Sequence, residues 1–535
     1  MGVYLNSETA RTLYKNETQK PYFIDKSLLL EELFPFVKEG SNYICITRPR
    51  RFGKTVMANM IAAFFSNAHD TADIFGKLQI SKKSGYQTYL NRYPVIHIPL
   101  NDITRQCASY EQYITRIETR LIRDLKKAYP HIGPDQEDSA IDTLTDLYAE
   151  DSSIRFIFIL DEWDFIFHQP YVTETEKKAY LSFLRSLLKD RPYVQLAYMT
   201  GILPIAKYSS GSELNMFMEY KMATEEKYST YFGFTEKEVD ILFERYQKKC
   251  MDNPQITRAG LKTWYNGYHT KSNQRIYNPR SVIVSLTNNN LGNYWTSSGP
   301  YDEIFYYIKN NIAAVREDLV RMISGVSIPI KIREYAASSM SLQTKDEIFS
   351  AMVVYGFLSY HEGTLQIPNQ ELMEKYQAVL ERNSMGEVKK IIIKSREMLV
   401  ATLSCEEGRV AEILEEVHDR EIPFLSYNDE NSLSCVITLC YLAAREDYHI
   451  YREEKSGKGY CDYLFLPRTT RHPAIILELK VNESKESAIQ QIKNKNYLQK
   501  TEAYPEVILV GINYGKKEKK HTCKIEKIKN VNGNN

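Results

Sequence analysis

Hydrophobic runs and helical patterns alternate along roughly the first 230 residues of the chain. Short and mostly apolar runs, typical of strands buried in a parallel sheet, lie at residues 42–47, 93–100, 154–160 and 194–199. A helical pattern at residues 57–66 separates the first two of these runs. The alternation predicts an α/β fold, in which helices cover both faces of a parallel sheet.

The pattern changes twice beyond this first part. Residues 235–387 have mostly helical patterns, for example at 236–249 and 346–356. Further on, helical patterns continue to about Glu416, and another helix is expected to begin near Glu430. We therefore expect a helical middle region, followed by a second α/β domain.

Two strand-like runs near the C-terminus, 460–466 and 474–480, are separated by a segment with Pro467 and Pro473. They predict a hairpin. The boundaries that we expect divide the chain into residues 1–234, 235–387 and 388–535.

The composition is that of an ordinary globular protein. With 535 residues, of which 43% are hydrophobic and 26% charged, the chain can bury full cores. No apolar run approaches the roughly 18 residues that span a bilayer, and the first residues lack the pattern of a signal peptide. We therefore expect a cytoplasmic protein with no membrane partner. Its eight cysteines are scattered without a C-x-x-C pair, so neither a disulfide framework nor a structural metal site is predicted.

Charge is balanced overall but not along the chain. The net charge is +1, whereas residues 451–535 contain 17 Lys and Arg against 10 Asp and Glu. A basic surface of this kind can attract phosphates without sequence specificity. Solubility alone would also account for it, particularly at Lys516–Lys520, which we expect to be a solvated or frayed end.

The segment Arg48-Pro-Arg-Arg-Phe-Gly-Lys-Thr55 follows the first apolar run and opens the first helical pattern. A helix N-terminus at this point can bind phosphates. The Lys54 ammonium can reach the β- and γ-phosphates of a nucleotide, the Thr55 hydroxyl can bind Mg²⁺, and backbone N–H groups from Phe52 onward can cradle the anion. In the pattern G-x-x-x-x-G-K-[ST], however, Arg48 occupies the place of the first glycine. The alternative is a basic turn with a chance Gly-Lys-Thr.

A second motif ends the apolar run at 154–160 with the carboxylates Asp161 and Glu162. Asp161 would hold Mg²⁺ through water, and Glu162 would polarise the attacking water. Thr200, at the end of the next run, could sense the γ-phosphate, although a plain strand end would look the same. A solvated acidic turn after a core strand is the alternative for the pair.

The C-terminal hairpin carries another group of charged residues. Glu478 and Lys480 are two positions apart on one strand and therefore point to the same side, where Asp462 on the neighbouring strand can meet them. Two carboxylates beside a lysine can hold a divalent cation that activates water at a scissile phosphate. A cross-strand ion pair on the surface would have the same spacing, but charges at the end of so apolar a strand are unusual unless they serve a site.

Taken together, these motifs resemble a family of bacterial proteins with an N-terminal AAA-ATPase-like domain and a C-terminal PD-(D/E)XK nuclease-superfamily domain. The phosphate loop of that family also begins with arginine. The segments that carry the resemblance are Tyr22–Ser27, Arg48–Thr55, Leu160–Asp164, Tyr231–Glu236, Trp264–Tyr268, Tyr277–Ser281, Tyr294-Trp295, Gly457–Asp462, Glu478–Lys480 and Ala488–Ile492.

The resemblance implies an N-terminal P-loop domain that binds ATP with Mg²⁺, and a metal-dependent nuclease-like core. Glu430 and Gln491 are implied as companions of the Asp462, Glu478 and Lys480 signature. The cofactor-binding residues that we expect are Arg51, Phe52, Gly53, Lys54, Thr55, Val56, Asp161 and Thr200. Metal ligands are expected at Thr55, Asp161, Asp462, Glu478 and Glu430, and catalytic groups at Glu162, Asp462, Glu478 and Lys480.

Two functions of different classes fit these motifs. The first is an ATPase coupled to a domain that cleaves nucleic acid of unspecified type. The second is an ATP-dependent switch or scaffold, in which the nuclease-like domain only binds a partner. Arg275 and Arg280 could serve the nucleotide of another subunit, but local salt bridges are the simpler expectation, and we leave open whether the chain forms a homo-oligomer.

Overall fold

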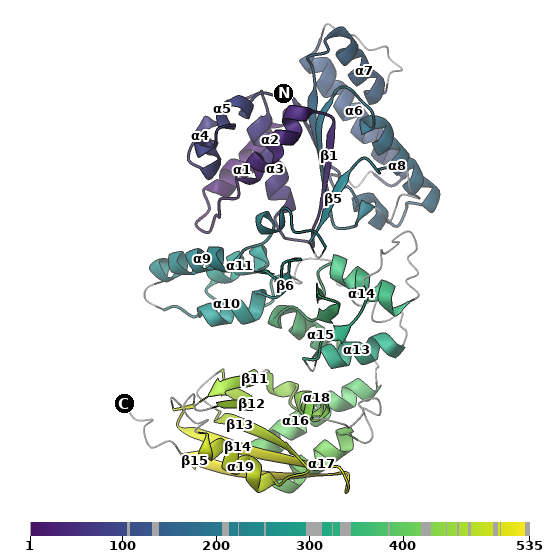
Figure 1. Ribbon diagram of the computed structural model, residues 1–535. Helices are drawn as coiled ribbons and strands as arrows, with labels where there is room; N and C mark the ends of the chain where they lie inside the picture. Colours follow the sequence, from purple (N-terminus) through teal and green to yellow (C-terminus); the bar gives the residue numbers. More distant parts are fainter. Residues whose placement is uncertain are drawn as a thin grey trace. The chain divides into compact units, whose positions relative to one another are not determined.

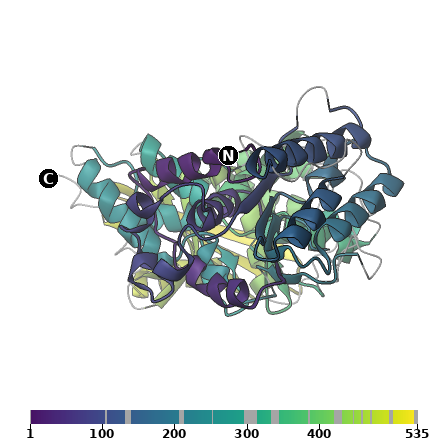
Figure 2. The same ribbon diagram turned by 90° about the horizontal axis from the view of Figure 1, so that it is seen from above.

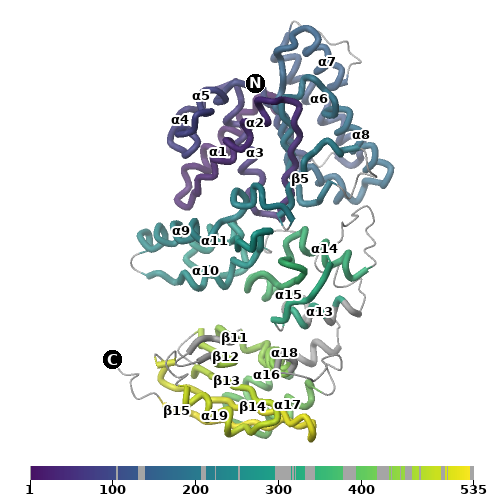
Figure 3. The backbone as a smooth tube through the Cα atoms, in the orientation of Figure 1, coloured from purple at the N-terminus to yellow at the C-terminus, as the bar shows by residue number. Residues whose placement is uncertain are grey.

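The computed structural model divides the chain into two compact units. The first comprises Met1–Ile312 and Pro329–Leu372, and the second Ala313–Ile328 and Met373–Asn535. Figure 3 traces the backbone. The structure describes all residues except 1, 104–106, 131–138, 206–212, 223, 251–252, 296–312, 324, 332–343, 383–385, 419–429, 446, 457–458, 469–471, 496–500, 503 and 530–535. The predicted boundaries at 234 and 387 stay predictions.

The first unit is built around a five-stranded sheet with the order β2-β3-β4-β1-β5. All of its strand pairs are parallel. The strands are β1 (Asn42–Thr47), β2 (Val95–Pro99), β3 (Phe156–Asp161), β4 (Val194–Gly201) and β5 (Met218–Lys221). The α/β fold and the parallel sheet predicted from the sequence are thus confirmed, and β1 lies inside the sheet between β4 and β5.

Helices cover both faces of this sheet, because successive strand residues point to opposite sides. On β1, Ile44 and Ile46 pack against α1–α5, whereas Tyr43 and Cys45 belong to the core beneath α6–α8. Figures 1 and 2 show these two layers. The helices are α1 (Glu8–Thr18), α2 (Leu29–Glu39), α3 (Lys54–Phe65), α4 (Ala72–Phe75), α5 (Tyr86–Tyr89), α6 (Tyr110–Ala128), α7 (Ala140–Glu150) and α8 (Glu174–Leu188).

The helical segment that follows has its own buried core and a polar network. Its elements are α9 (Glu236–Lys249), α10 (Arg258–Tyr265), β6 (Tyr268–His269), β7 (Arg275–Ile276), α11 (Pro279–Asn288), α14 (Lys345–Val354), β9 (Ser359–His361) and β10 (Thr364–Gln366), and α15 (Gln370–Arg382) begins at its end. The helix predicted at 236–249 is α9. The short strands β6, β7, β9 and β10 were not predicted, because two or three residues are too few to carry a periodic signal.

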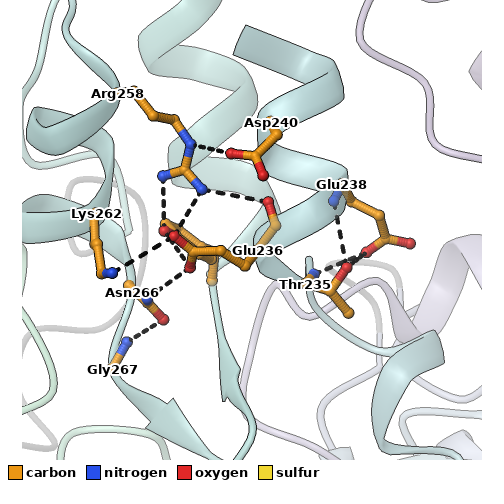
Figure 4. A network of polar contacts seen from close by, with 9 residues as sticks. Thr235, Glu236, Glu238, Asp240, Arg258, Lys262, Asn266 and Gly267 are labelled. Carbon is orange, nitrogen blue, oxygen red and sulfur yellow. Dashed lines mark hydrogen bonds and ion pairs between the residues drawn. The ribbon is translucent and has the colours of Figure 1, made fainter.

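Arg258 is the centre of that polar network (Figure 4). Its guanidinium pairs with Glu236 at 2.9 Å and Asp240 at 2.7 Å on α9, and it donates to the Tyr277 hydroxyl at 2.8 Å. Tyr277 in turn donates to Glu236. These bonds tie α9 and α10 to the residues immediately before α11, so the start of α11 is fixed.

The second unit contains a mixed five-stranded sheet with the order β11-β12-β13-β14-β15, in which only the β13–β14 pair is parallel. Its helices α16–α18 pack on one face and α19 on the other. The elements are α13 (Ala313–Ile323), α16 (Gly386–Leu403), α17 (Glu407–Glu416), α18 (Glu430–Cys440), β11 (Tyr448–Ser456), β12 (Gly459–Pro467), β13 (Ala474–Val481), α19 (Lys485–Asn494), β14 (Glu506–Gly515) and β15 (Lys520–Lys529), and β8 (Ile328–Pro329) lies at the boundary with the first unit.

The lysine-rich segment Lys516–Lys520 corrects one expectation. Its residues are exposed, as expected of a solvated segment, but they form the turn between β14 and β15 instead of a frayed end, and these strands pair over their whole length down to Gly515 and Lys520. The expectation failed because β15 alternates lysines with apolar residues, a pattern that reads as polar until the neighbouring strand is known. The β12–β13 hairpin, by contrast, is confirmed.

Within the described ranges, no helix is both long and apolar enough to cross a membrane. None of the seven cysteines that the structure describes is in a disulfide bond.

Gly267 allows a test of the first unit's packing. Its φ is +109°, and a Cβ at this position would lie 1.8 Å from the carbonyl oxygen of Pro368. We expect Gly267→Ala to destabilise the first unit by more than about 2 kcal/mol, because backbone strain and a clash add. Gly363→Ala is the control: its φ is +82° but its Cβ would meet nothing within 4 Å. Thermal unfolding should show a larger loss for Gly267→Ala than for Gly363→Ala, because only the first adds a clash to the backbone strain; equal losses would contradict the clash.

Candidate functional site

The loop between β1 and α3 places a buried ammonium at the start of a helix. Gly53 is the N-cap of α3, with a φ of 91° that favours glycine. Lys54, the first residue of α3, is only 5% exposed. Its Nζ donates to the carbonyl oxygens of Arg48 at 2.9 Å and Pro49 at 3.0 Å, so the lysine is held across its own loop. Burial lowers the pKa of Lys54, against the nearby carboxylates led by Glu162, which raise it.

Arg48 explains why the loop can begin without glycine. Arg48 is absent from the residues with positive φ, so its backbone does not need a glycine. Its side chain is fully buried, packs over the ring of Phe232 at 5.2 Å and donates to the carbonyl oxygens of Thr47 and Tyr220. Burial lowers its pKa to about 10. The arginine therefore anchors the loop to strand β5.

A cavity of about 660 Å³ opens beside this loop. Its cationic side is formed by the phosphate-loop residues and by Arg280, the second residue of α11. Its apolar side includes Tyr22, Phe234 and Ile283. The volume falls within the usual range of small-molecule sites. The predicted residues that line this cavity are Arg51, Phe52, Gly53, Lys54, Thr55, Val56 and Glu162.

Two predicted residues, Asp161 and Thr200, do not line this cavity, and Thr200 holds the acidic pair Asp161 and Glu162 in place. Asp161, the last residue of β3, is buried and accepts a hydrogen bond from the Thr200 hydroxyl. The same hydroxyl accepts from the Glu162 backbone N–H at 3.3 Å. Thr200 thus fixes both carboxylate residues, and its role towards a γ-phosphate stays a prediction. Glu162 itself has a φ of 56°, a strained conformation of the kind found at functional sites.

Asn101 was missed by the sequence analysis. Its side-chain amide donates to the Glu162 carboxylate at 2.7 Å. Burial raises the pKa of Glu162, and the Lys54 ammonium lowers it. Its position directly after the apolar run at 93–100 could have identified it, because the carboxyl ends of parallel strands meet at one edge of the sheet. Arg280, which the sequence analysis considered for the nucleotide of another subunit or for local salt bridges, lines this cavity of its own chain.

In the second unit, the three signature residues come together as the hairpin predicted. Lys480 Nζ lies 3.7 Å from Glu478 Oε1, and the backbone N–H of Asp462 donates to Glu478 Oε2 at 3.4 Å. Asp462 in turn accepts from the Leu479 N–H at 2.7 Å. Gln491 on α19 donates to Glu478, as the companion role implied. The carboxylates and the lysine therefore share one side of the β12–β13 pair.

Glu478 is 2% exposed, and this burial governs its charge. Burial and the neighbouring Asp462 carboxylate raise the pKa of Glu478 to about 7, while the Lys480 ammonium lowers it. A carboxylate with so high a pKa is costly to ionise without a further cation. Among the described residues, no group of three or more His, Cys, Asp or Glu side chains could hold a metal ion. Glu430 begins α18, but its side chain lies outside what the structure describes.

Two protein-family models match the chain. Residues 13–210 match the family model described as "Predicted AAA-ATPase", and residues 428–524 match the model of the PD-(D/E)XK nuclease superfamily. The chain therefore combines an AAA-ATPase-like domain with a C-terminal domain of the PD-(D/E)XK nuclease superfamily, as the motifs implied.

More distant similarities add little to this assignment of the two domains. An uncharacterized protein in the vnfD 5′ region of Azotobacter chroococcum mcd 1 is 24% identical over 290 residues, which are 52% of this chain and 51% of that protein. The match thus spans about half of the relative's length. Similar solved structures are the Walker-type ATPase paby2304 of Pyrococcus abyssi (12% identity, TM-score 0.36, 66% of this chain and 94% of that chain) and Cdc6p of Pyrobaculum aerophilum (10%, 0.26, 69% and 93%). A third is the ORC2 protein of Aeropyrum pernix (9%, 0.32, 66% and 92%).

The raised pKa of Glu478 predicts a pH dependence of stability. The folded domain binds this proton more tightly than the unfolded chain, so the stabilisation is complete below pH 4.5 and is lost as the pH rises through about 7. A shift of this size corresponds to about 3 kcal/mol. We expect Glu478→Gln to remove that part of the pH dependence, measured as hydrogen exchange of β13 between pH 4.5 and 8. The exposed Glu486→Gln should retain it, and identical pH profiles for both variants would contradict the assignment.

Proposed function

We propose that the chain binds and hydrolyses ATP in the cavity of the first unit, and that this activity controls a metal-dependent nuclease-like domain that acts on nucleic acid. The observation that carries the ATPase is the buried Lys54 ammonium, which faces the Glu162 carboxylate across a cavity of nucleotide size. Such a site needs positioned charge more than covalent chemistry, because phosphoryl transfer depends on neutralising the phosphates and orienting a nucleophile.

The lining of the cavity fits ATP. Lys54 and the backbone N–H groups that open α3 would hold the phosphates, together with Arg280, which lines the same cavity. The apolar wall with Tyr22 and Phe234 would take the base. Gly53 would allow the phosphates to approach the loop backbone closely. A Cβ at this position would meet nothing within 4 Å, so open space lies beside the loop.

Oxygen donors at and beside this cavity fit Mg²⁺. The Thr55 hydroxyl would hold the ion, and the buried Asp161 carboxylate would hold it through water; the bound ion would neutralise phosphate charge. Thr200 keeps Asp161 oriented, and Glu162 can take a proton from an attacking water while Asn101 holds its carboxylate in place.

The nuclease-like site supports a second, metal-dependent step. Asp462 and Glu478 offer two carboxylates on neighbouring strands, and Lys480 can stabilise developing negative charge beside them. A divalent cation would supply Lewis acidity and an activated water there. The net positive charge of residues 451–535 would attract a nucleic-acid backbone. We propose a cytoplasmic location for this activity, as the sequence suggests.

The ATPase is tested by two substitutions with different outcomes. Lys54→Ala should weaken ATP binding at least about tenfold, because the buried phosphate-facing charge is lost. Glu162→Gln should bind ATP as the parent does but turn over at least about 100-fold more slowly, because the base is gone. Calorimetry and phosphate release measure the two effects. The exposed Glu244→Gln is the control, and turnover in Glu162→Gln equal to that of the parent would contradict the role of the carboxylate.

The nuclease-like domain is tested with a mixed panel of DNA and RNA, Mg²⁺ or Mn²⁺, and with or without ATP. Asp462→Ala should lose cleavage by at least about 100-fold and retain binding, because it loses a metal ligand. Asp447→Ala, an exposed carboxylate of the same domain, should cleave like the parent. No cleavage by folded parent protein that binds ATP would favour the switch or scaffold, in which this domain only binds a partner.

A further inference from the structure

The motif Tyr294-Trp295 lies far from the phosphate loop in sequence but is bonded to it. Arg51 Nη1 donates to the carbonyl oxygens of Tyr294 at 2.9 Å and Trp295 at 2.5 Å. In the opposite direction, the indole N–H of Trp295 donates to the carbonyl oxygen of Arg50 at 3.1 Å. Three hydrogen bonds thus join two residues of the loop to this motif.

These bonds hold the loop in a strained shape. Arg51 has a φ of 68°, in the left-handed region that costs a non-glycine residue about 1 kcal/mol or more. A residue in this region persists only where its surroundings fix it. The guanidinium bonds to Tyr294 and Trp295 supply that constraint, while the buried ring of Phe52 packs edge-on against Tyr268 at 5.0 Å.

One buried carboxylate organises the motif. Glu371, in the first turn of α15, is 2% exposed. Its Oε1 accepts from the backbone N–H groups of Tyr294 at 2.7 Å and Trp295 at 2.6 Å. The peptide group between Tyr294 and Trp295 thus donates its N–H to Glu371 and presents its carbonyl oxygen to Arg51.

The same carboxylate also accepts a hydrogen bond from the segment that carries Arg280. The Ser281 hydroxyl donates to both Glu371 oxygens at 2.9 Å. Ser281 follows Arg280, which lines the cavity at the N-terminus of α11. Glu371 therefore bonds directly to the segment that carries Arg280 and, through Tyr294-Trp295, to the loop that carries Arg51, although it does not line the cavity itself.

We propose that Glu371 is a positioning residue for the phosphate site, which sets the phosphate loop through Tyr294-Trp295 and sets Arg280 through Ser281. The expected effect of Glu371 on turnover rests on the proposed ATPase, whereas its expected effect on the shape of the loop does not. Burial raises the pKa of Glu371 to about 7, against the N–H groups of Trp295 and Tyr294, which lower it. The carboxylate therefore keeps its place by hydrogen bonding, and a neutral acceptor of the same shape can replace it.

The first test needs no nucleotide. In the full chain, Glu371→Ala leaves the Tyr294 and Trp295 amides and the Ser281 hydroxyl without their acceptor, so the amides of residues 48–55 should exchange at least about tenfold faster. Glu371→Gln keeps an oxygen for the two amides and should exchange within about threefold of the parent. Loop exchange in Glu371→Ala equal to that of the parent would overturn the proposal, whatever the ATPase result.

The second test separates positioning from loss of fold. In calorimetric titration with ATP, Glu371→Ala should keep about one site per chain with Kd raised about tenfold. In the phosphate-release assay, kcat should fall about 100-fold, because phosphate-facing groups are misplaced. Glu371→Gln should restore both values, and the exposed Glu244→Ala should leave them unchanged. A reduced number of sites with the parent Kd would mean a structural role only and would overturn the proposal. Absence of ATP binding in the parent would remove the ATPase and leave the exchange test to decide.

Trp295→Phe provides a variant that retains most of the packing against Phe357, which lies 5.3 Å away ring to ring. It removes only the indole N–H that bonds to Arg50. Loop exchange should rise about two- to tenfold, since one of three bonds to the loop is lost. Unchanged exchange in both Trp295→Phe and Glu371→Ala would show that this motif does not hold the loop.

Discussion

The first unit depends on how three buried or half-buried cations of one loop are bonded. Arg48, Arg51 and Lys54 all donate to main-chain carbonyl oxygens: those of Thr47 and Tyr220, of Tyr294 and Trp295, and of Arg48 and Pro49. Carbonyl dipoles offset part of the cost of desolvating a cation without neutralising it, while Nε and Nη2 of Arg48 are buried without a hydrogen-bond partner among the described residues. The loop therefore keeps a positive field for an anionic ligand, which direct pairing with carboxylates would have cancelled.

This solution makes the loop dependent on distant parts of the chain. Tyr220 belongs to the edge strand β5, and Tyr294 belongs to the helical segment after α11, so the loop is shaped from both sides. The Arg258 network in turn fixes the residues that lead into α11. A short loop with strained Arg51 could not hold its shape alone, since strain persists only where surrounding contacts outweigh it.

Sequence patterns could predict the strands and the two sites, but not the contacts that hold them. β1 ends where its predicted run ends, and β3 and β13 end one residue beyond theirs, because apolar strands followed by charges are a local signal. Glu371 was invisible, since its partner Ser281 lies 90 residues away and neither residue is unusual in its own segment. Thr200 was noticed as a strand end, whereas its bond to Asp161 appears only in the sheet.

The two sites differ in the groups that stabilise the charge of their glutamate, and this difference decides whether a site needs a further cation to ionise it. Burial raises the pKa of Glu162 as well, but the Lys54 ammonium lowers it and Asn101 holds the carboxylate, so the chain itself supplies groups that stabilise its charge. For Glu478, burial and the Asp462 carboxylate raise the pKa to about 7, and the Asp462 effect is larger than the opposing effect of Lys480. Ionising both carboxylates at neutral pH therefore requires positive charge beyond that lysine, and a divalent cation is the group that such oxygen donors select.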